Sequence, residues 1–460
     1  MVNIIFLCLR NLKLKINFEL IKMKNTKLTT ILIIICITIC SCQKKGCTDP
    51  NAINYNSQAN KDDGGCEYIQ EDFLLTGTLN SDKTLDPSVI WSMEGRVIVP
   101  NGVTLTIPAG TIIKSKPGTG ANATSLVIAR GGKLFAQGTE SSPIIMTSES
   151  DDITIGANSG SSLSENVRGL WGGLLILGYA PGSFSGDVTE FQIEGIPASE
   201  TNGLYGGNDP SDNSGIIQYI SIRHGGAEIG EGNEINGLTL GCVGYGTTIN
   251  HIEVVGNVDD GVEFFGGTVN ASELLVWGQG DDGLDIDQAY AGTISNSMVI
   301  LNDASDHALE IDGPEGSATG SFTLNNLTLV GTNNECSATG VDGEIADYRK
   351  GATGNNSNIY VKGFTTGKDI ELDADADAVS FSSGNLTFSG FEFSPANYDG
   401  NNCFTPDLTN GSIFNDKSSV GSSFESDGIT ICTVVGDGAN NIGADISEFS
   451  WTYANEKGAL

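Results

Sequence analysis

Residues 259–265 read DDGVEFF, residues 281–287 read DDGLDID, and residues 306–312 read DHALEID. The second copy begins 22 residues after the first, and the third begins 25 residues after the second. Each copy alternates apolar and acidic side chains, which is the period of a β-strand, and a second apolar run follows. A repeat in the low twenties with several short strands per copy is typical of a solenoid. The sequence therefore predicts an all-β fold, a single parallel β-helix in which each coil stacks on the last.

The same pattern of short apolar runs continues through the chain from about Ile69. Runs such as 103–107 and 322–330 are separated by turn residues, and no amphipathic helical stretch of convincing length interrupts them. With 61 Gly and only 12 Pro, the composition suits many tight turns. We expect one β-helix domain over residues 69–460. Trp451 and Tyr453 are expected to cover its last coil, where strand edges would otherwise be exposed.

An export signal precedes this domain. A short basic stretch at residues 24–27 is followed by an apolar run from Leu28 to Cys40. The run is too short for a comfortable membrane span and has the length of the apolar core of a signal peptide. An uncleaved anchor helix is the alternative.

The apolar run ends in ICSC at residues 39–42, which resembles the bacterial lipobox. In a lipobox the cysteine is acylated and becomes the mature N-terminus. The resemblance implies a lipid on Cys42 and a removed leader, residues 1–41. Residues 1–22 are unusual ahead of such a signal, so we expect Met23 to be the true start. We therefore expect a lipoprotein of the cell envelope, held at the outer membrane and displayed at its surface.

Residues 42–68 form a short spacer between this cysteine and the β-helix. Cys47 and Cys66 bracket the spacer, and in an oxidising compartment we expect them to pair. Such a cross-link stabilises a fold by roughly 3 kcal/mol on the chain-entropy model. The segment resembles a module of secreted proteins of the Bacteroidetes. It carries carboxylates that suit Ca²⁺, namely Asp49, Asp62 and Asp63, although a spacer without metal is an equal alternative.

The remaining cysteines of the body leave one question open. Cys403 and Cys432 are candidates for a second disulfide, with Cys336 as an alternative partner. Cys242 lies in an apolar run and is typical of a buried thiol.

The net charge excludes several kinds of partner. The whole chain carries −34, and the leader holds six Lys or Arg and one Glu, so removing its +5 leaves −39. This charge argues against nucleic acid and anionic lipid as partners and suits a protein surrounded by divalent cations. We expect a monomer whose partners are the membrane, through the lipid, and a glycan or a surface protein.

Several stretches together resemble one known family. The chain is similar to β-helix lipoproteins and secreted proteins of flavobacteria, with relatives among spirochaete outer-membrane lipoproteins. The resemblance implies a right-handed β-helix like that of pectin lyase, and the family has no settled activity. The matching stretches are 103–115, 126–148, 169–181, 233–246, 259–270 and 451–460.

Acidic side chains are predicted to form a ladder on the outside of the repeated coils. Strand alternation points Val262, Leu284 and Leu309 inward and the acids between the apolar residues outward. Neighbouring coils lie about 4.8 Å apart, so stacked carboxylates repel one another unless protons or cations intervene. The outward acids are Glu263, Asp285, Asp287, Glu310 and Asp312.

No cation is supplied by the local sequence. The 125 residues between Arg223 and Arg349 hold 21 Asp and Glu but no Lys or Arg. A charge run is usually a solvated face, yet a face this acidic indicates a metal or a shared-proton site. We expect Ca²⁺ on the ladder, because hard carboxylate oxygens are its preferred ligands.

Three functions remain open. A glycoside hydrolase would use stacked carboxylates, for which Asp260, Asp282 and Asp285 are the candidates, but further motifs of the similar polygalacturonases are missing. A polysaccharide lyase would need an Arg or Lys base beside Ca²⁺, and the acidic face is expected to have neither. A non-catalytic binding or adhesive protein needs no such residues, and we favour it.

Overall fold

The computed structural model describes two compact units, Met1–Ile69 and Gln70–Leu460. The leader, Cys42 and Cys336 lie outside the described residues. No helix among the described residues is both long and apolar enough to cross a membrane. The described residues are 44–50, 52, 54–66, 73–197, 199–228, 234–331, 344–364, 368–394, 396–398, 401–404, 413–436 and 438–460.

The first unit is cross-linked by a disulfide between Cys47 and Cys66, which confirms the predicted pairing. Two isolated bridges accompany it, one between Lys45 and Lys61 and one between Cys47 and Tyr55. Regular secondary structure is otherwise scarce in its described part, so the cross-link constrains a segment that buries little apolar surface.

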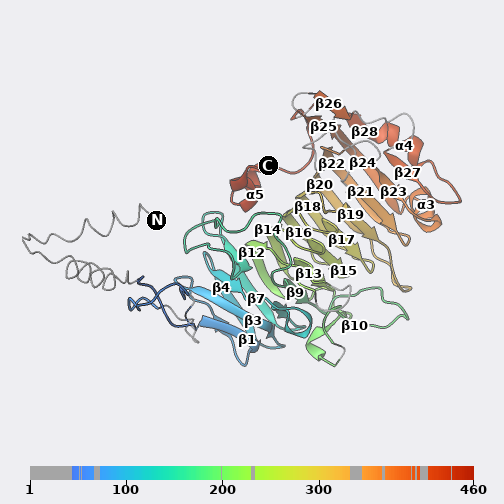
Figure 1. Ribbon diagram of the computed structural model, residues 1–460. Coiled ribbons are helices and arrows are strands. Elements are labelled where there is room, and N and C mark those ends of the chain that lie inside the picture. Colours follow the sequence, from blue (N-terminus) through green and yellow to red (C-terminus); the bar gives the residue numbers. More distant parts are fainter. Residues whose placement is uncertain are drawn as a thin grey trace, which may run out of the picture. The chain divides into compact units, whose positions relative to one another are not determined.

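The second unit is a parallel β-helix, as the repeat predicts. Its main sheet has 24 strands, and Figure 1 shows them stacked in chain order from the blue β1 to the red β28. The first stack consists of β1 (Leu74–Thr78), β3 (Ile90–Val99), β6 (Ser125–Ile128), β9 (Leu174–Leu177), β13 (Leu238–Gly241), β15 (Val262–Phe265), β17 (Leu284–Asp287), β19 (His307–Asp312), β21 (Glu344–Arg349), β23 (Ile370–Leu372) and β27 (Phe414–Asp416).

A second stack of strands runs beside the first. Short strands β5 (Ile112–Ser115) and β8 (Ile144–Ser148) join it, because they pair with parts of β3 and β12. The second stack consists of β2 (Lys83–Thr84), β4 (Thr104–Pro108), β7 (Lys133–Gln137), β12 (Gly215–Arg223), β14 (Thr248–Val255), β16 (Ala271–Trp277), β18 (Thr293–Ile300), β20 (Phe322–Val330), β22 (Gly354–Lys362), β24 (Leu386–Ser394) and β28 (Cys432–Val434).

From β12 onward, each long strand of the second stack bends at one residue with positive φ. The bends lie in register from coil to coil, because the residues on either side of them are paired. Asn is among the least strained non-glycine residues in this conformation, and it occupies three of the bends. The bending residues are Tyr219, His251, Glu273, Asn296, Asn326 and Asn358, with φ between 48° and 58°, and Gly390 of β24, with φ of 65°.

An insertion between β9 and β12 covers the outside of the first stack at its early coils. It contains the hairpin of β10 (Phe191–Gln192) and β11 (Leu204–Tyr205). Its Phe184 and Tyr205 pack in one cluster with Leu175, Leu177 and Phe265 of the strands. The outward positions of these coils are apolar, so they need a cover, whereas the later coils carry acids there.

Residues 438–460, which we call the C-terminal strap, lie along the outside of the second stack. The strap contains a 3-10 turn, Ile446–Phe449, and the helix α5 (Tyr453–Lys457). Phe449 and Ala454 pack against Leu275 and Met298, which point outward from β16 and β18. Figure 1 accordingly places the red α5 near the green β14 rather than at the red end of the stack.

The prediction that Trp451 and Tyr453 cover the last coil is therefore wrong. The backbone N–H of Tyr453 donates to the buried carboxylate of Glu253 on β14, at 3.1 Å. The last coils are instead packed by the helix α4 (Phe424–Ile431), whose Phe424 ring lies 5.2 Å from that of Phe414. The C-terminal strap therefore packs on the apolar side chains that point outward from the second stack.

The cysteine question is answered for two residues. Cys242 is a buried free thiol, as predicted. Cys432 is also a buried free thiol, and its Sγ donates to the carbonyl of Gly428 at 2.6 Å. The suggested disulfide through Cys432 is therefore not formed.

Candidate metal centre

One acid from each copy of the repeat lies in a single column on the first stack, which we call the acidic column. Glu263 of β15 is paired with Asp285 of β17, and Asp285 is paired with Glu310 of β19. The column continues through Asp347 of β21 and Glu371 of β23. The sequence repeat predicted the first three positions, and strand pairing adds the last two.

One end of this acidic face carries its own cations. Arg349 of β21 is paired with Asp312, and its Nε donates to Asp312 Oδ1 at 2.7 Å. The same guanidinium forms an ion pair with Glu310, and Lys350 lies 2.5 Å from Asp312 Oδ2. The expectation that the chain supplies no cation is wrong at this end. Arg349 and Lys350 belong to the next coil, and they directly follow the stretch of sequence that has no Lys or Arg.

The other end gathers three carboxylates, which we call the carboxylate cluster: Asp260, Glu263 and Asp285. Each offers an oxygen within 4.8 Å of the others, and all three side chains are buried. Asp260 stands in the turn before β15, and the other two belong to neighbouring coils. In the described part of the chain, no Lys, Arg or His forms an ion pair with any of them. The outward acids Glu263 and Asp285 are thus enclosed, and a solvated face does not describe this end of the column.

Two buried oxygen atoms, one in this cluster and one on the neighbouring Asn236, have no hydrogen-bond partner among the described residues. They are Oδ1 of Asp285 and Oδ1 of Asn236, and both are buried. Asn236 is 1% exposed, and its Nδ2 donates to Glu263. It stands before β13 as Asp260 stands before β15, one coil further along. Orphaned acceptors of this kind are rare in folded proteins, because each leaves a desolvated oxygen uncompensated.

Burial and mutual repulsion raise the pKa of the clustered acids. Burial, followed by the charges of neighbouring carboxylates, raises the pKa of Asp260, Glu263 and Asp285 well above their usual range. Burial and the charge of Asp312 raise the pKa of Asp287 to about 6. The cluster therefore does not hold three bare negative charges at neutral pH, and it takes up either protons or a cation.

Further acids form a rim around the cluster. An oxygen of Asp259 and one of Asp281 lie within 4.8 Å of each other and of Asp260. Burial and the charge of Glu194 raise the pKa of Asp259 to about 7. Glu194 comes from the insertion between β9 and β12, so the hairpin brings acidic charge to coils distant in sequence.

Sequence reasoning missed two residues of this site. Nothing near Glu194 repeats, and only the fold of the insertion places it beside Asp259. Asn236 did carry a signal, because the Asn236-Gly237 pair precedes β13 just as the Asp260-Gly261 pair precedes β15. Aligning the coil before the first acidic copy would have found it.

Asp282, one of the hydrolase candidates, is engaged by His307. His307 Nδ1 donates to Asp282 Oδ1 at 2.8 Å, and the backbone N–H of His307 donates to the same oxygen at 2.7 Å. Burial disfavours the charged imidazole, but the hydrogen bond and charges of Asp282, with those of Asp306 and Asp347, outweigh it and raise the pKa of His307 to about 9. Asp282 thus has a cationic partner that the cluster lacks.

The acids of the first unit are placed differently. Asp62 Oδ1 accepts from the N–H of Gly64, and Asp63 Oδ1 accepts from the N–H of Gly65, both of which are turn contacts. The groups of acids close enough to share a cation, among the described residues, all lie on the β-helix. A calcium site at Asp49, Asp62 and Asp63 remains a prediction from the sequence.

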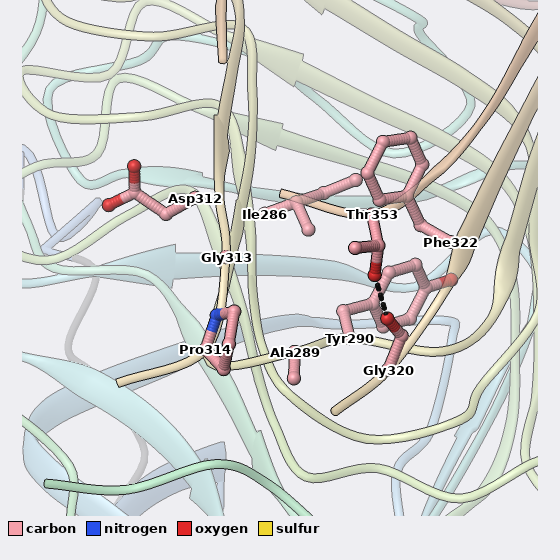
Figure 2. A pocket seen from close by; sticks show the side chains of 9 residues that line it. All are labelled: Ile286, Ala289, Tyr290, Asp312, Gly313, Pro314, Gly320, Phe322 and Thr353. Atoms are coloured by element: carbon pink, nitrogen blue, oxygen red, sulfur yellow. Dashed lines mark hydrogen bonds between the residues drawn. The ribbon is translucent and has the colours of Figure 1, made fainter. Parts of the chain in front are cut away.

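A small cavity lies inside the later coils, and Figure 2 shows the side chains around it. The rings of Tyr290 and Phe322 border it, and the hydroxyl of Thr353 donates to the carbonyl of Gly320. Its free volume of about 10 Å³ suits one water molecule and not a sugar. The remaining lining residues are Ile286, Ala289, Asp312, Gly313 and Pro314.

Comparison with known proteins bears on the fold. A sequence profile of the family described as the pectate-lyase like beta helix domain matches residues 77–426. No curated protein and no solved structure matches the chain.

Proposed function

The chain belongs to the pectate-lyase-like β-helix family, and on that premise we propose that it is a non-catalytic binding or adhesive protein of the cell envelope. In this proposal a lipid on Cys42 holds it to the outer membrane, and Ca²⁺ neutralises part of its acidic face. The partner is a glycan or a surface protein.

One observation carries the non-catalytic role: the carboxyl groups that a hydrolase would use are closed to a polymer. Asp260 is 6% exposed, Asp282 is 4% exposed, and Oδ1 of Asp285 is buried, although the residue as a whole is partly exposed. A glycoside hydrolase needs two carboxyl groups that flank a glycosidic bond, about 5 Å or more apart, with the sugar between them. Oxygens of Asp260 and Asp285, together with one of Glu263, lie within 4.8 Å of one another, and such a group admits a proton or a small cation instead.

The lyase alternative gains a residue from the structure but not a base. Arg349 lies on the acidic face, contrary to the expectation that this face has no Arg or Lys. Its guanidinium is held by Asp312 and Glu310, however, so the nitrogens that would act on a substrate are already engaged. A catalytic base must reach the proton that it removes, so Arg349 in this arrangement supports structure and not catalysis.

Catalysis is tested with pectins, alginates, and neutral and sulfated glycans, with Ca²⁺ present. We expect binding to some of these or to none, and no change in chain length of any. Turnover that disappears in Asp282→Asn or Asp285→Asn would reverse the proposal in favour of a glycoside hydrolase.

Tethering is tested separately by cell fractionation and mass spectrometry. We expect the protein in the membrane fraction, with an acylated Cys42 as its first residue, and the Cys42→Ala variant in the soluble fraction. A Cys42→Ala variant that stays membrane-bound would contradict the lipid anchor.

A further inference from the structure

We propose that Asp260, Glu263, Asp285 and Asn236 form one buried site for a hard divalent cation, Ca²⁺ in the first place. The proposal rests on the proposed function only for the identity of the ion. It goes beyond the proposed function in the location and number of ions, because it places one cation in an enclosed centre and not on the outer face of the ladder.

The first argument is the charge that the site encloses. Three carboxylates converge within 4.8 Å, and their side chains are buried. Asp260 accepts one hydrogen bond, from the backbone N–H of Asp282 at 2.9 Å. Two coils further on, Glu310 and Asp312 are neutralised by Arg349 and Lys350. The cluster has no equivalent partner among the described residues, so it needs a positive charge that is not part of the chain.

A second and independent argument comes from the orphaned oxygens. Oδ1 of Asn236 and Oδ1 of Asp285 are buried, and neither accepts a hydrogen bond from a described residue. The Nδ2 of Asn236 donates to Glu263, so the amide oxygen needs a partner other than that carboxylate. A cation satisfies an amide oxygen and carboxylate oxygens together, and both types are ordinary ligands of Ca²⁺.

The ligand types select the class of ion. All four side chains offer oxygen, which suits Ca²⁺, Mg²⁺ or Mn²⁺ and not the metals that prefer imidazole or thiolate. His307, the nearest imidazole, is committed to Asp282. Three carboxylates with one or two oxygens each, and an amide, fit the six to eight ligands of Ca²⁺ better than the strict octahedron of Mg²⁺, which keeps several waters.

The position of the site defines its role. Asn236 precedes β13, Asp260 and Glu263 belong to β15 and its turn, and Asp285 belongs to β17. A cation here ties three consecutive coils together beneath the insertion that carries Glu194. Its ligands are enclosed, so it stabilises the coils and does not bridge to a substrate.

The test uses the mature lipid-free chain, stripped with chelator and then titrated with CaCl₂ by calorimetry. We expect one Ca²⁺ per β-helix, and we expect Asp285→Asn or Glu263→Gln to weaken it by roughly tenfold or more. The acids of the first unit are a separate candidate for Ca²⁺ binding. Asp62→Asn in the full chain is therefore the control, and it should leave this binding event unchanged.

Thermal unfolding separates a metal centre from a merely repulsive cluster. In chelator, Asp285→Asn removes one buried like charge, so its melting temperature should exceed that of the wild type. In CaCl₂ the order should reverse, because the variant has lost a ligand. Asp312→Asn is the matched control, and it should lower the melting temperature equally in both buffers, since its partners are Arg349 and Lys350.

Two results would overturn the centre. One is an Asp285→Asn effect of the same sign and size in both buffers, and the other is equal protection by NaCl at matched ionic strength. If Asp285→Asn does not fold, Glu263→Gln keeps the side-chain shape and gives the same reversal or its absence. Glycan turnover or a soluble wild type would defeat the proposed function and leave the Ca²⁺ stoichiometry untouched, so the two failures are distinguishable.

Discussion

Glu310 and Glu263 occupy equivalent positions on the acidic column two coils apart, yet their surroundings differ in charge. Glu310 forms an ion pair with Arg349, and His307 Nδ1 lies 3.7 Å from its carboxylate. Glu263 faces Asp260, Asp285 and Asn236, with no cationic side chain in the described part of the chain. In a solenoid the partner of a residue comes from the adjacent coil. The charge balance therefore changes from coil to coil even where the repeated sequence stays the same.

The largest expected effect is the pH dependence of the metal-free protein. The folded state raises the pKa of Asp259 to about 7 and that of Asp287 to about 6, from an ordinary value near 4. Carboxyl groups with raised pKa stabilise the fold at low pH, and this stability is lost as pH rises through the folded-state values. We expect the free energy of unfolding in chelator to fall by ~3 kcal/mol or more between pH 4.5 and 7.5, at about 1.4 kcal/mol per pKa unit.

The measurement is denaturant unfolding at several pH values, with and without CaCl₂. Ca²⁺ should remove most of the loss near pH 7.5 and little at pH 4.5, where protons already neutralise the acids. A metal-free protein whose stability rises over this pH range would show that the carboxylate cluster and its rim are solvated and not enclosed.

The next effect concerns the other end, where Arg349→Met removes the cation. Asp312 is 5% exposed and Glu310 is 14% exposed at the side chain, so both would lose a partner inside the protein. Burial already raises the pKa of Asp312, and in the variant this carboxyl would take up a proton, which limits the cost. We expect a loss of about 3 kcal/mol, near the lower limit for breaking a buried pair.

Chemical denaturation with Ca²⁺ held constant measures this loss. The control is Lys116→Met, which breaks an exposed pair with Glu94 and should change stability by less than about 1 kcal/mol. Equal effects of the two substitutions would mean that Arg349 is no more than a surface charge.

His307→Gln sharpens the comparison through pH. The pKa of His307 is raised to about 9 in the folded state, from an ordinary value near 6.5. Its contribution to stability is therefore complete below pH 6.5 and is lost as pH rises to 9. We expect the free energy of unfolding of the variant to be about 2 kcal/mol lower at pH 6 and little changed at pH 9.5. The loss at pH 6 is limited because Asp306, one of the acids beside the imidazole, is half-exposed and screened by salt.

The pH profile of the difference between variant and wild type is the measurement. NMR titration of the imidazole gives the pKa directly. A difference that does not vary with pH would assign His307 a packing role instead.

The sequence could predict the fold and only part of the site. Alternation in the repeat was sufficient for the coils, and it placed Glu263, Asp285 and Glu310 in one column, because the period of a strand is fixed. It could not show that Glu263 is enclosed, since the cover comes from an insertion with no repeat. It could not identify Arg349 as the partner of Asp312 either. Arg349 follows the stretch without Lys or Arg along the chain, but strand pairing places it beside Asp312 of the preceding coil.

The smallest expected effect is that of Lys350→Met, and it tests whether Arg349 alone defines the paired end. Lys350 lies 2.5 Å from Asp312, but its side chain is 50% exposed, so water and salt already stabilise both charges. Arg349 contacts Asp312 through two nitrogens, at 2.7 and 3.1 Å, in the bidentate geometry that lysine does not form. We expect Lys350→Met to lower the free energy of unfolding by at most about 1 kcal/mol, and by less in 0.5 M NaCl. A loss as large as that of Arg349→Met, and insensitive to salt, would mean that Asp312 requires both cations. The paired end would then resemble the carboxylate cluster, with more negative charge than one cation can balance.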